Sequence, residues 1–401
     1  MTSAGDRSDA ALKRALLLLA PTVTIVVAAE FIVVGLLPLV AKDLHIPLAQ
    51  AGALAGWFAF SAAVAGPFVT LFAARLSPRF VLTATLLLYA LGNLVVGLAH
   101  DFTVVVLARI VQGAALPAFI SVGAIVVTRL SPAHAHGKDL ARANIGFVLG
   151  VLLALPAGVA LAEGGDWRLP FYVLAAGSLP MAALVAFLFP HIPPNKAKML
   201  GAQLGLLRQP LFLAHLGLSV LLFGAMFAAY TYLGAWIEEA LGLSGLGIAF
   251  VLFLFGIAGL FGNGIAGRVA DRAPIKATVI AIIVLVASVN LASLSHGSWL
   301  LAALPLAFWS VSHTASVTLG QVRVTLAGKA APAFAMTLNI SAANLGIAVG
   351  TVGGGNLIDR YGIEAIGIAP IGFAAAALAL VILIVRILAT RSAPAATTAT
   401  V

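Results

Sequence analysis

Residues 15–41 read ALLLLAPTVTIVVAAEFIVVGLLPLVA, a run of 27 residues that holds one charged side chain, Glu30. A helix needs about 20 apolar residues to cross a bilayer core about 30 Å thick. This run is therefore long enough to span a membrane, and eleven further apolar runs follow it along the chain. Apolar runs of this length predict helices, because membrane strands alternate apolar and polar residues.

The composition agrees with twelve spans. The 401 residues are 62% hydrophobic and 9% charged, whereas a soluble domain is about 45–50% apolar and about 25% charged. These figures exclude a soluble enzyme, a nucleic-acid-binding protein and a disordered chain. The sequence therefore predicts an all-α integral membrane protein in contact with the lipid bilayer.

The distribution of Lys and Arg predicts the orientation. With the N-terminus in the cytoplasm, 18 of the 22 cations fall in cytoplasmic segments, and only Lys42, Arg168 and Arg360 fall outside. This is the positive-inside pattern, so the formal charge of +9 requires no nucleic-acid partner. We expect a multi-pass protein of a bacterial-type inner membrane, with both termini in the cytoplasm.

The chain also divides into two similar parts. The longest cytoplasmic connection, 191–208, separates six spans from six. The end of the second span, GPFVTLFAARLSPRF, resembles the end of the eighth, GNGIAGRVADRAPIK, at an offset of 197 residues. We expect two six-helix bundles, 1–190 and 211–390, a cytoplasmic linker over 191–210 and a disordered cytoplasmic tail over 391–401. Two parallel repeats are typical of transporters that bind their substrate near the midplane, between the halves.

Several short motifs lie on particular spans. The first span carries EFIVVGLLPLVAKDL (30–44), and the fourth carries LARIVQGAALPAF (107–119). The fifth carries GFVLGVLLALPAGVAL (146–161), and the segment from the tenth to the eleventh span includes Gln321, Arg323, Asn339, Ser341, Asn344 and Gly346. The loops after the second and eighth spans hold Arg75 and Arg79, and Gly267, Asp271 and Arg272.

In this order, the motifs resemble the major facilitator superfamily, and within it the twelve-span drug/proton antiporters of the arabinose- and sugar-efflux-like permease branch. The two loops are similar to the superfamily's signature loop, although Ala74 replaces its acid in the first copy. The fourth span matches the Arg-x-x-Gln-Gly element at Arg109, Gln112 and Gly113. The resemblance implies rocker-switch alternating access, with the residues Arg75, Arg79, Asp271 and Arg272 as latches between states.

Glu30 is the only acid that the sequence places inside a span. An ionised carboxylate at the bilayer centre costs roughly 2.5–3.5 kcal/mol on insertion scales, so such residues are functional candidates. A buried carboxyl can hold a proton and release it on solvation. We predict that Glu30 carries a proton and contacts substrate; a neutral hydrogen-bonding role between helices is the alternative.

Arg109 is the only cation that we expect inside a span. Its guanidinium stays charged, so with Gln112 it is predicted to pair with Glu30 or to bind an anionic substrate. The alternative is that its side chain extends to the nearby membrane surface.

The fifth span holds Gly146, Gly150, Pro156 and Gly158. Small residues at this spacing let helices approach closely, and a proline permits a kink. The pattern suits a seam that moves during transport, or equally static packing. The resemblance to the antiporter motif adds a conformational role for these four residues.

Further polar and aromatic side chains are candidates for substrate contacts. Trp309 and His313 lie one helical turn apart and can share a face. Buried amides and phenols need hydrogen-bond partners and can orient polar groups in a cavity; between helices they serve packing instead. The remaining candidates of this kind are Tyr230, Tyr232, Asn339 and Asn344.

The sequence thus predicts a proton-coupled secondary exporter of a small organic molecule, functional as a monomer. There is no cysteine, no metal-ligand spacing of His, Asp and Glu, and no Gly-x-x-x-x-Gly-Lys-Ser/Thr loop, so we expect no cofactor, no metal and no ATP-driven or enzymatic role. Symport or facilitated diffusion is the first alternative, and a non-transporting receptor or scaffold is the second.

Overall fold

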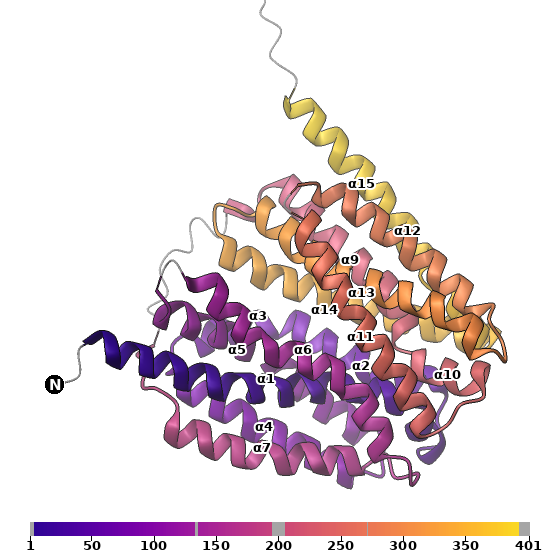
Figure 1. Cartoon of the computed structure of the whole chain (residues 1–401), viewed down its shortest axis with the longest axis horizontal. Helices are drawn as coiled ribbons and strands as arrows, with labels where there is room; N and C mark the ends of the chain where they lie inside the picture. The colour runs from indigo at the N-terminus through magenta and orange to yellow at the C-terminus, as the bar shows by residue number, and fades with distance from the viewer. Residues whose placement is uncertain (1–3, 133–134, 195–204, 271, 393–401) are drawn as a thin grey trace, which may run out of the picture.

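A computed structural model describes residues 4–132, 135–194, 205–270 and 272–392 (Figure 1). Within these residues there are helices and no strand, which confirms the predicted all-α class. In the first half the helices are α1 (Ala4–Asp43), α2 (Leu48–Val64), α3 (Gly66–Ala73), α4 (Pro78–Leu98), α5 (Phe102–Leu130), α6 (His136–Leu161) and α7 (Leu169–Leu188). In the second half they are α9 (Pro210–Tyr230), α10 (Leu233–Leu241), α11 (Leu246–Val269), α12 (Pro274–Ser293), α13 (Trp299–Ala327), α14 (Pro332–Tyr361), η2 (Ile363–Gly367) and α15 (Ile371–Ser392).

The predicted number of spans is also confirmed. Eleven segments of the described chain are long and apolar enough to cross a membrane, and the bent pair α2 and α3 raises the number to twelve. The two helices of this pair meet at 51°. Pro67 explains the bend, because a proline ring inside a helix removes a hydrogen bond and collides with the preceding turn.

Local sequence signals set the helix starts. Besides α3 with its Pro67, five helices, α4, α7, α9, α12 and α14, begin with a proline in their first two positions, where the fixed φ of proline suits a helix and no amide donor is lost. Asp101 caps α5 by accepting from the amide of Thr103 at 2.7 Å. Residues at the starts of these helices therefore determine where the spans begin.

The internal repeat is visible in the helix bounds. Both bounds of α13 follow those of α5 by 197 residues, which is the offset of the two signature-like loops. One expectation was wrong: the count of cations places Arg323 in a cytoplasmic segment, but α13 continues to Ala327 and Arg323 is 1% exposed. Hydrogen bonds to His215 and Ser219 allow this guanidinium to be buried.

Twelve spans that alternate in direction end on the side where they began, so the start of α1 and the end of α15 lie on one face of the molecule. We call this the termini face and the opposite one the far face. The first half lies beside the second, as the indigo-to-magenta and orange-to-yellow ribbons show (Figure 1). The halves join through α2 on α14 and α6 on α11. Towards the far face, the amide of Ala49 donates to Asp359 at 3.4 Å.

The outer surface of the helices is apolar. Phe68, Phe187 and Leu300 are 72%, 79% and 69% exposed. Large apolar areas of this kind are not left in contact with water by soluble proteins. The exposed side chains are therefore the lipid-facing surface of a multi-pass membrane protein.

Candidate functional site

A small cavity lies between the two halves at mid-depth, and we call it the central cavity. Its volume is about 10 Å³, close to the least that can hold one water molecule. The first half contributes lining residues from α1 and α2, and the second contributes one residue each from α9 and α14. The lining consists of Glu30, Phe31, Val34, Ala55, Phe58, Ala59, Phe227 and Ile347.

Glu30 is the charged residue of this lining. Its side chain is half-buried, and among the described residues no hydrogen bond or ion pair engages its carboxylate. The titratable groups whose charge acts on it are Arg109 on α5 and Tyr89 on α4. The carboxylate is therefore free to meet a proton or a ligand in the cavity.

Arg109 lies beside Glu30 but is bound to the backbone of α1. Its Nη1 donates to the carbonyl of Ala29 at 2.7 Å, and its Nη2 donates to the carbonyl of Glu30 at 2.8 Å. The guanidinium is 0% exposed, and its carbon lies 4.3 Å from the centre of the Phe58 ring. The expected ion pair with the Glu30 carboxylate is not formed in this structure. The guanidinium instead binds the backbone of α1, the helix that carries the carboxylate.

Gln112 connects Arg109 to α4. Its Oε1 accepts from Arg109 Nη1 at 3.3 Å, and its Nε2 donates to Asn93 Oδ1 at 2.9 Å. The hydroxyl of Tyr89 donates to the Gln112 carbonyl at 3.1 Å. Gln112 is 0% exposed. It positions Arg109 from the side of α4 and does not line the cavity.

An aromatic cluster adjoins the cavity on the side of the second half. The rings of Phe227 and His313 are 5.4 Å apart, and those of Tyr230 and His313 are 4.5 Å apart. Trp309 packs edge-on against Phe255 at 5.7 Å. Trp309 and His313 thus share one cluster, as their spacing predicts. Among the described buried atoms without a hydrogen-bond partner are Trp309 Nε1 and His313 Nδ1.

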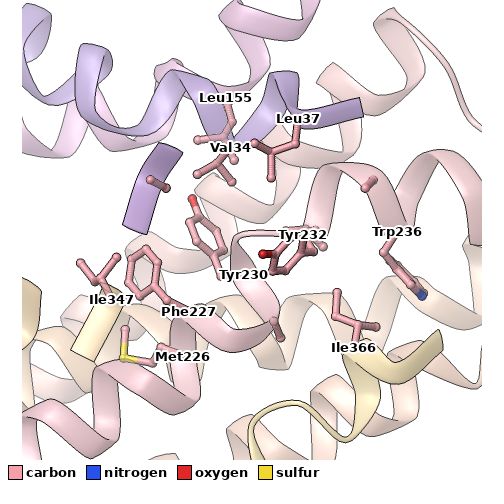
Figure 2. Close-up of a cluster of buried hydrophobic side chains, with 14 of the residues drawn as sticks. Val34, Leu37, Leu155, Met226, Phe227, Tyr230, Tyr232, Trp236, Ile347 and Ile366 are labelled. Carbon is pink, nitrogen blue, oxygen red and sulfur yellow. The ribbon is translucent and has the colours of Figure 1, made fainter. Parts of the chain in front are cut away.

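Two rings of this region face the first half. The hydroxyl of Tyr230 points towards Val34 and Leu155, and Phe227 lies beside Ile347 (Figure 2). Phe227 also stacks on Phe31 of α1, with ring centres 6.2 Å apart. Phe227 is therefore the member of the aromatic cluster that lines the central cavity, and Tyr230 and His313 pack next to it.

Three other candidates lie away from the cavity. Tyr232 is 0% exposed, and its hydroxyl donates to the Thr351 carbonyl at 2.9 Å. Asn339 accepts from Ser219 at 2.7 Å, in a network in which Arg323 Nη2 donates to Ser219 at 3.0 Å. Asn344 donates to the carbonyl of Ile340 on its own helix at 3.0 Å. In this structure these hydrogen bonds all lie within the second half.

The glycines of α6 face α1 of their own half. A Cβ at Gly146 would overlap the carbonyl of Ala20, and one at Gly158 would lie 2.6 Å from Ile32 Cγ1. Gly150 approaches Val27 in the same way, and Pro156 is buried nearby. These residues therefore allow α6 to pack closely on the helix that carries Glu30, and the contact of α6 with α11 is formed by other residues, such as Leu152 and Gly256. The conformational role of the four residues stays a prediction.

The loop residues lie at the termini face. Arg75 and Arg272 are exposed and Arg79 is half-buried. The described residues provide no hydrogen-bond or ion-pair partner for these three side chains. Asp271 lies outside the described residues, as do 195–204 of the expected linker and 393–401 of the expected tail. A latch between the two loops stays a prediction.

Sequence reasoning missed the three rings that line the central cavity with Glu30. Phe31, Phe58 and Phe227 read as ordinary apolar residues of membrane helices, and no spacing within one helix relates them. Asn93 was missed as well; a buried amide inside a span is a signal that could have found it. The described residues also contain no group of three His, Cys, Asp or Glu side chains placed to hold a metal ion.

The sequence profile of the Major Facilitator Superfamily matches residues 19–331. The chain belongs to the major facilitator superfamily. It is therefore a membrane transporter of that superfamily.

Two curated relatives match most of this chain. A probable sugar efflux transporter of Pasteurella multocida is 29% identical over 342 residues, which cover 85% of this chain and 84% of the relative. The inner membrane transport protein YdhP of Escherichia coli K12 is 28% identical over 335 residues, covering 82% and 85%.

Solved structures support the same fold. A bacterial homologue of the human lysosomal transporter Spinster, described as inward-facing and unoccupied, superposes with a TM-score of 0.81 at 16% identity, covering 98% of this chain and all of that one. The nucleoside transporter NupG gives a TM-score of 0.73 at 16% identity, covering 94% and 99%. At this identity the likeness concerns the fold alone.

Proposed function

We propose that this superfamily member is a proton-coupled exporter of a small organic molecule, with Glu30 as the proton carrier. The observation that supports the proposal is the unpaired Glu30 carboxylate in a cavity between the two halves. A carboxylate in such a place favours protonation when the cavity is dry and loses its proton when water or a cationic group enters. Proton binding can then be coupled to movement of the halves.

The contacts of the halves suit alternating access. In this structure α2 and α14 meet near the far face, where Ala49 bonds Asp359 and Gly56 lies 3.6 Å, measured from its Cβ position, from the Ala348 carbonyl. Separation of this contact would open the cavity to the far face. Arg75, Arg79, Asp271 and Arg272 are proposed to hold the halves together at the termini face in that alternative state.

The orientation follows from the cations. We propose that the termini face is cytoplasmic, because 18 of the 22 Lys and Arg residues were assigned to that side. The relative from Escherichia coli is named an inner membrane protein, and an inner membrane location is proposed for this chain too. The central cavity lies within one chain, so a monomer is proposed to be sufficient for transport.

The proposal is tested in proteoliposomes that contain a pH-sensitive dye. We expect wild-type protein to couple substrate movement to proton movement, and Glu30→Gln to lose gradient-driven transport while retaining substrate exchange. Glu239→Gln is the matched control, since Glu239 is an exposed acid on α10. Undiminished gradient-driven transport by Glu30→Gln would overturn the assignment of Glu30.

Proton symport on the same fold is the second candidate. The glycines that resemble an antiporter motif pack against α1 within one half, so their contacts do not distinguish the two directions of coupling. The sign of the dye response separates them: protons move against the substrate in an exporter and with it in a symporter.

A further inference from the structure

An open cleft of about 250 Å³ lies at the termini face, where the start of α1 meets the connection after α5 and the start of α6. We call it the α1–α6 cleft. The central cavity, by comparison, has a volume of about 10 Å³. We infer that the α1–α6 cleft binds the phosphodiester headgroup of an anionic membrane phospholipid. This inference is independent of the proposed transport mechanism.

The described lining of the α1–α6 cleft carries one net positive charge. Lys13 and Arg142 contribute two positive charges and Asp139 contributes one negative charge; the other lining residues are Leu12, Leu16, Pro132 and Ala135. The phosphodiester of phosphatidylglycerol carries a single negative charge, which this lining would neutralise. In phosphatidylcholine and phosphatidylethanolamine, the headgroup's own cation already neutralises the phosphate. The charge of the cleft therefore favours an anionic lipid.

Asp139 orients Arg142 and is not itself presented to a ligand. The residue is 3% exposed; its Oδ2 accepts from the Ser131 hydroxyl at 2.5 Å, and its Oδ1 accepts from Arg142 Nη1 at 3.0 Å. The side chain of Arg142 is 54% exposed, and among the described residues no partner engages its Nη2 or Nε. A guanidinium fixed through one nitrogen can donate from the other two to phosphate oxygens.

Lys13 lies at the depth of the lipid headgroups. It precedes Glu30 by 17 residues on the single helix α1, so the two lie about 25 Å apart along the axis at a rise of about 1.5 Å per residue. Glu30 is at mid-depth, and the headgroup layer ends about 20–22 Å from the bilayer midplane. The flexible stem of a lysine lets its ammonium reach the phosphate level. Lys13 is exposed, and no partner within the described chain engages it.

Arg142 lies at the border between headgroups and hydrocarbon, because it begins the apolar segment Arg142–Leu161. Ile145, Leu149 and Leu153 follow it on α6 at offsets of 3, 7 and 11 residues, so they share its helix face. All three are exposed. This apolar stripe is placed to bury an acyl chain of the lipid whose phosphate Arg142 binds.

The stripe distinguishes a lipid from a soluble phosphate compound. A soluble anion would gain only the two cations, which are screened by salt at an exposed site. A phospholipid gains the cations and the apolar stripe together. Basic pockets between membrane helices on the cytoplasmic side are suited to anionic headgroups for the same reason. We therefore assign the cleft to a lipid.

The charge selectivity is tested by native mass spectrometry of the purified protein in detergent, titrated with phosphatidylglycerol or phosphatidylcholine. We expect Lys13→Gln to lower the affinity for the first phosphatidylglycerol roughly fivefold and Lys13→Gln with Arg142→Gln roughly thirtyfold, since a cation near the surface contributes about that factor. Phosphatidylcholine should bind alike to all variants. Arg208→Gln is the matched control, because Arg208 is an exposed cation at the termini face of the second half.

Lys13→Gln leaves the pair of Arg142 with Asp139 intact, so it tests the site without disturbing the fold. Unchanged phosphatidylglycerol affinity in this variant and in the double variant, or an equal loss in Arg208→Gln, would overturn the inference. Equal wild-type affinity for phosphatidylethanolamine would also overturn it, because the net charge of the lipid would then be irrelevant.

A competition experiment identifies the source of the phosphate. We expect glycerophosphoglycerol, the headgroup of phosphatidylglycerol without its acyl chains, and inorganic phosphate to leave the bound phosphatidylglycerol in place. Displacement by either compound at concentrations comparable to that of the lipid would assign the cleft to a soluble anion and contradict the lipid assignment.

Discussion

Gly52 of the first half leaves the space that the Tyr232 hydroxyl of the second half occupies: a Cβ at position 52 would overlap that oxygen. Gly355 of α14 borders the same hydroxyl, which is fixed by its bond to the Thr351 carbonyl at 2.9 Å. Tyr232 interrupts the seventh span between α9 and α10. The ring therefore seals the contact between the halves near the far face, a position that its sequence context did not reveal.

Filling this space should open the far face. Overpacking costs about 1–3 kcal/mol, a factor of about 5 to 150 in an equilibrium, so Gly52→Ala should shift the protein away from the closed far face. The chain has no cysteine, so maleimide labelling of Thr351→Cys, at a site 0% exposed, reports the opening. Gly264→Ala is the control, because nothing lies within 4 Å of its Cβ position. Equal labelling of both variants would contradict this role.

A disulfide across the halves should stop the cycle. A Cβ at Gly56 lies 3.9 Å from the Cβ of Thr351, which matches the spacing of about 3.8 Å in disulfides. Gly56→Cys with Thr351→Cys should therefore cross-link on oxidation and lose transport, and reduction should restore it. Each single variant serves as control. Full transport by the oxidised double variant would show that the halves need not separate here.

Arg109 should act through its shape more than through its charge. Lysine keeps the charge but cannot hold two carbonyls with a planar fork. Hydrogen bonds to charged groups are worth about 1.5–3 kcal/mol each, so Arg109→Lys should lower the thermal stability in detergent, whereas Arg360→Lys at an exposed site should not. A stable Arg109→Lys variant that has lost binding of an organic anion would instead make Arg109 a substrate contact.

Asn339 should contribute to stability without contacting substrate. Its loss leaves Ser219, which also accepts from Arg323, with the carbonyl of His215 at 3.4 Å as its remaining acceptor, at a cost of about 0.5–1.5 kcal/mol. Asn339→Ala and Ser219→Ala should each lower the melting temperature, and their effects should not add, because both disrupt one network. Substrate-dependent proton movement in proteoliposomes should stay at the wild-type level in the two variants; a selective loss in Asn339→Ala would return it to the substrate site.

The spans, their number and the 197-residue repeat could be predicted because they depend on local apolar length and on helix-start signals such as Pro78 and Pro274. Glu30 was found in the same way, since a charge inside an apolar run is conspicuous. The end of α13 was missed because Arg323 reads as a residue of a connection. Its buried partners, His215 and Ser219, lie more than 100 residues away.

The composition of the site depended on contacts between helices, which no local pattern contains. Phe31 and Phe227 are 196 residues apart and meet only when the halves pack. Arg109 lies beside Glu30, but the sequence could not tell whether the guanidinium meets the carboxylate or the backbone carbonyl of Glu30.

The most direct test counts protons released when a ligand binds. Purified protein in weakly buffered detergent solution is titrated with a panel of sugars, nucleosides and drugs at several pH values, and the pH change is recorded. Glu30→Gln and Glu239→Gln are treated identically. The account predicts release of up to one proton per bound ligand in wild type and Glu239→Gln, and none in Glu30→Gln. Ligand binding without proton release across the pH range, or release that persists in Glu30→Gln, would contradict it.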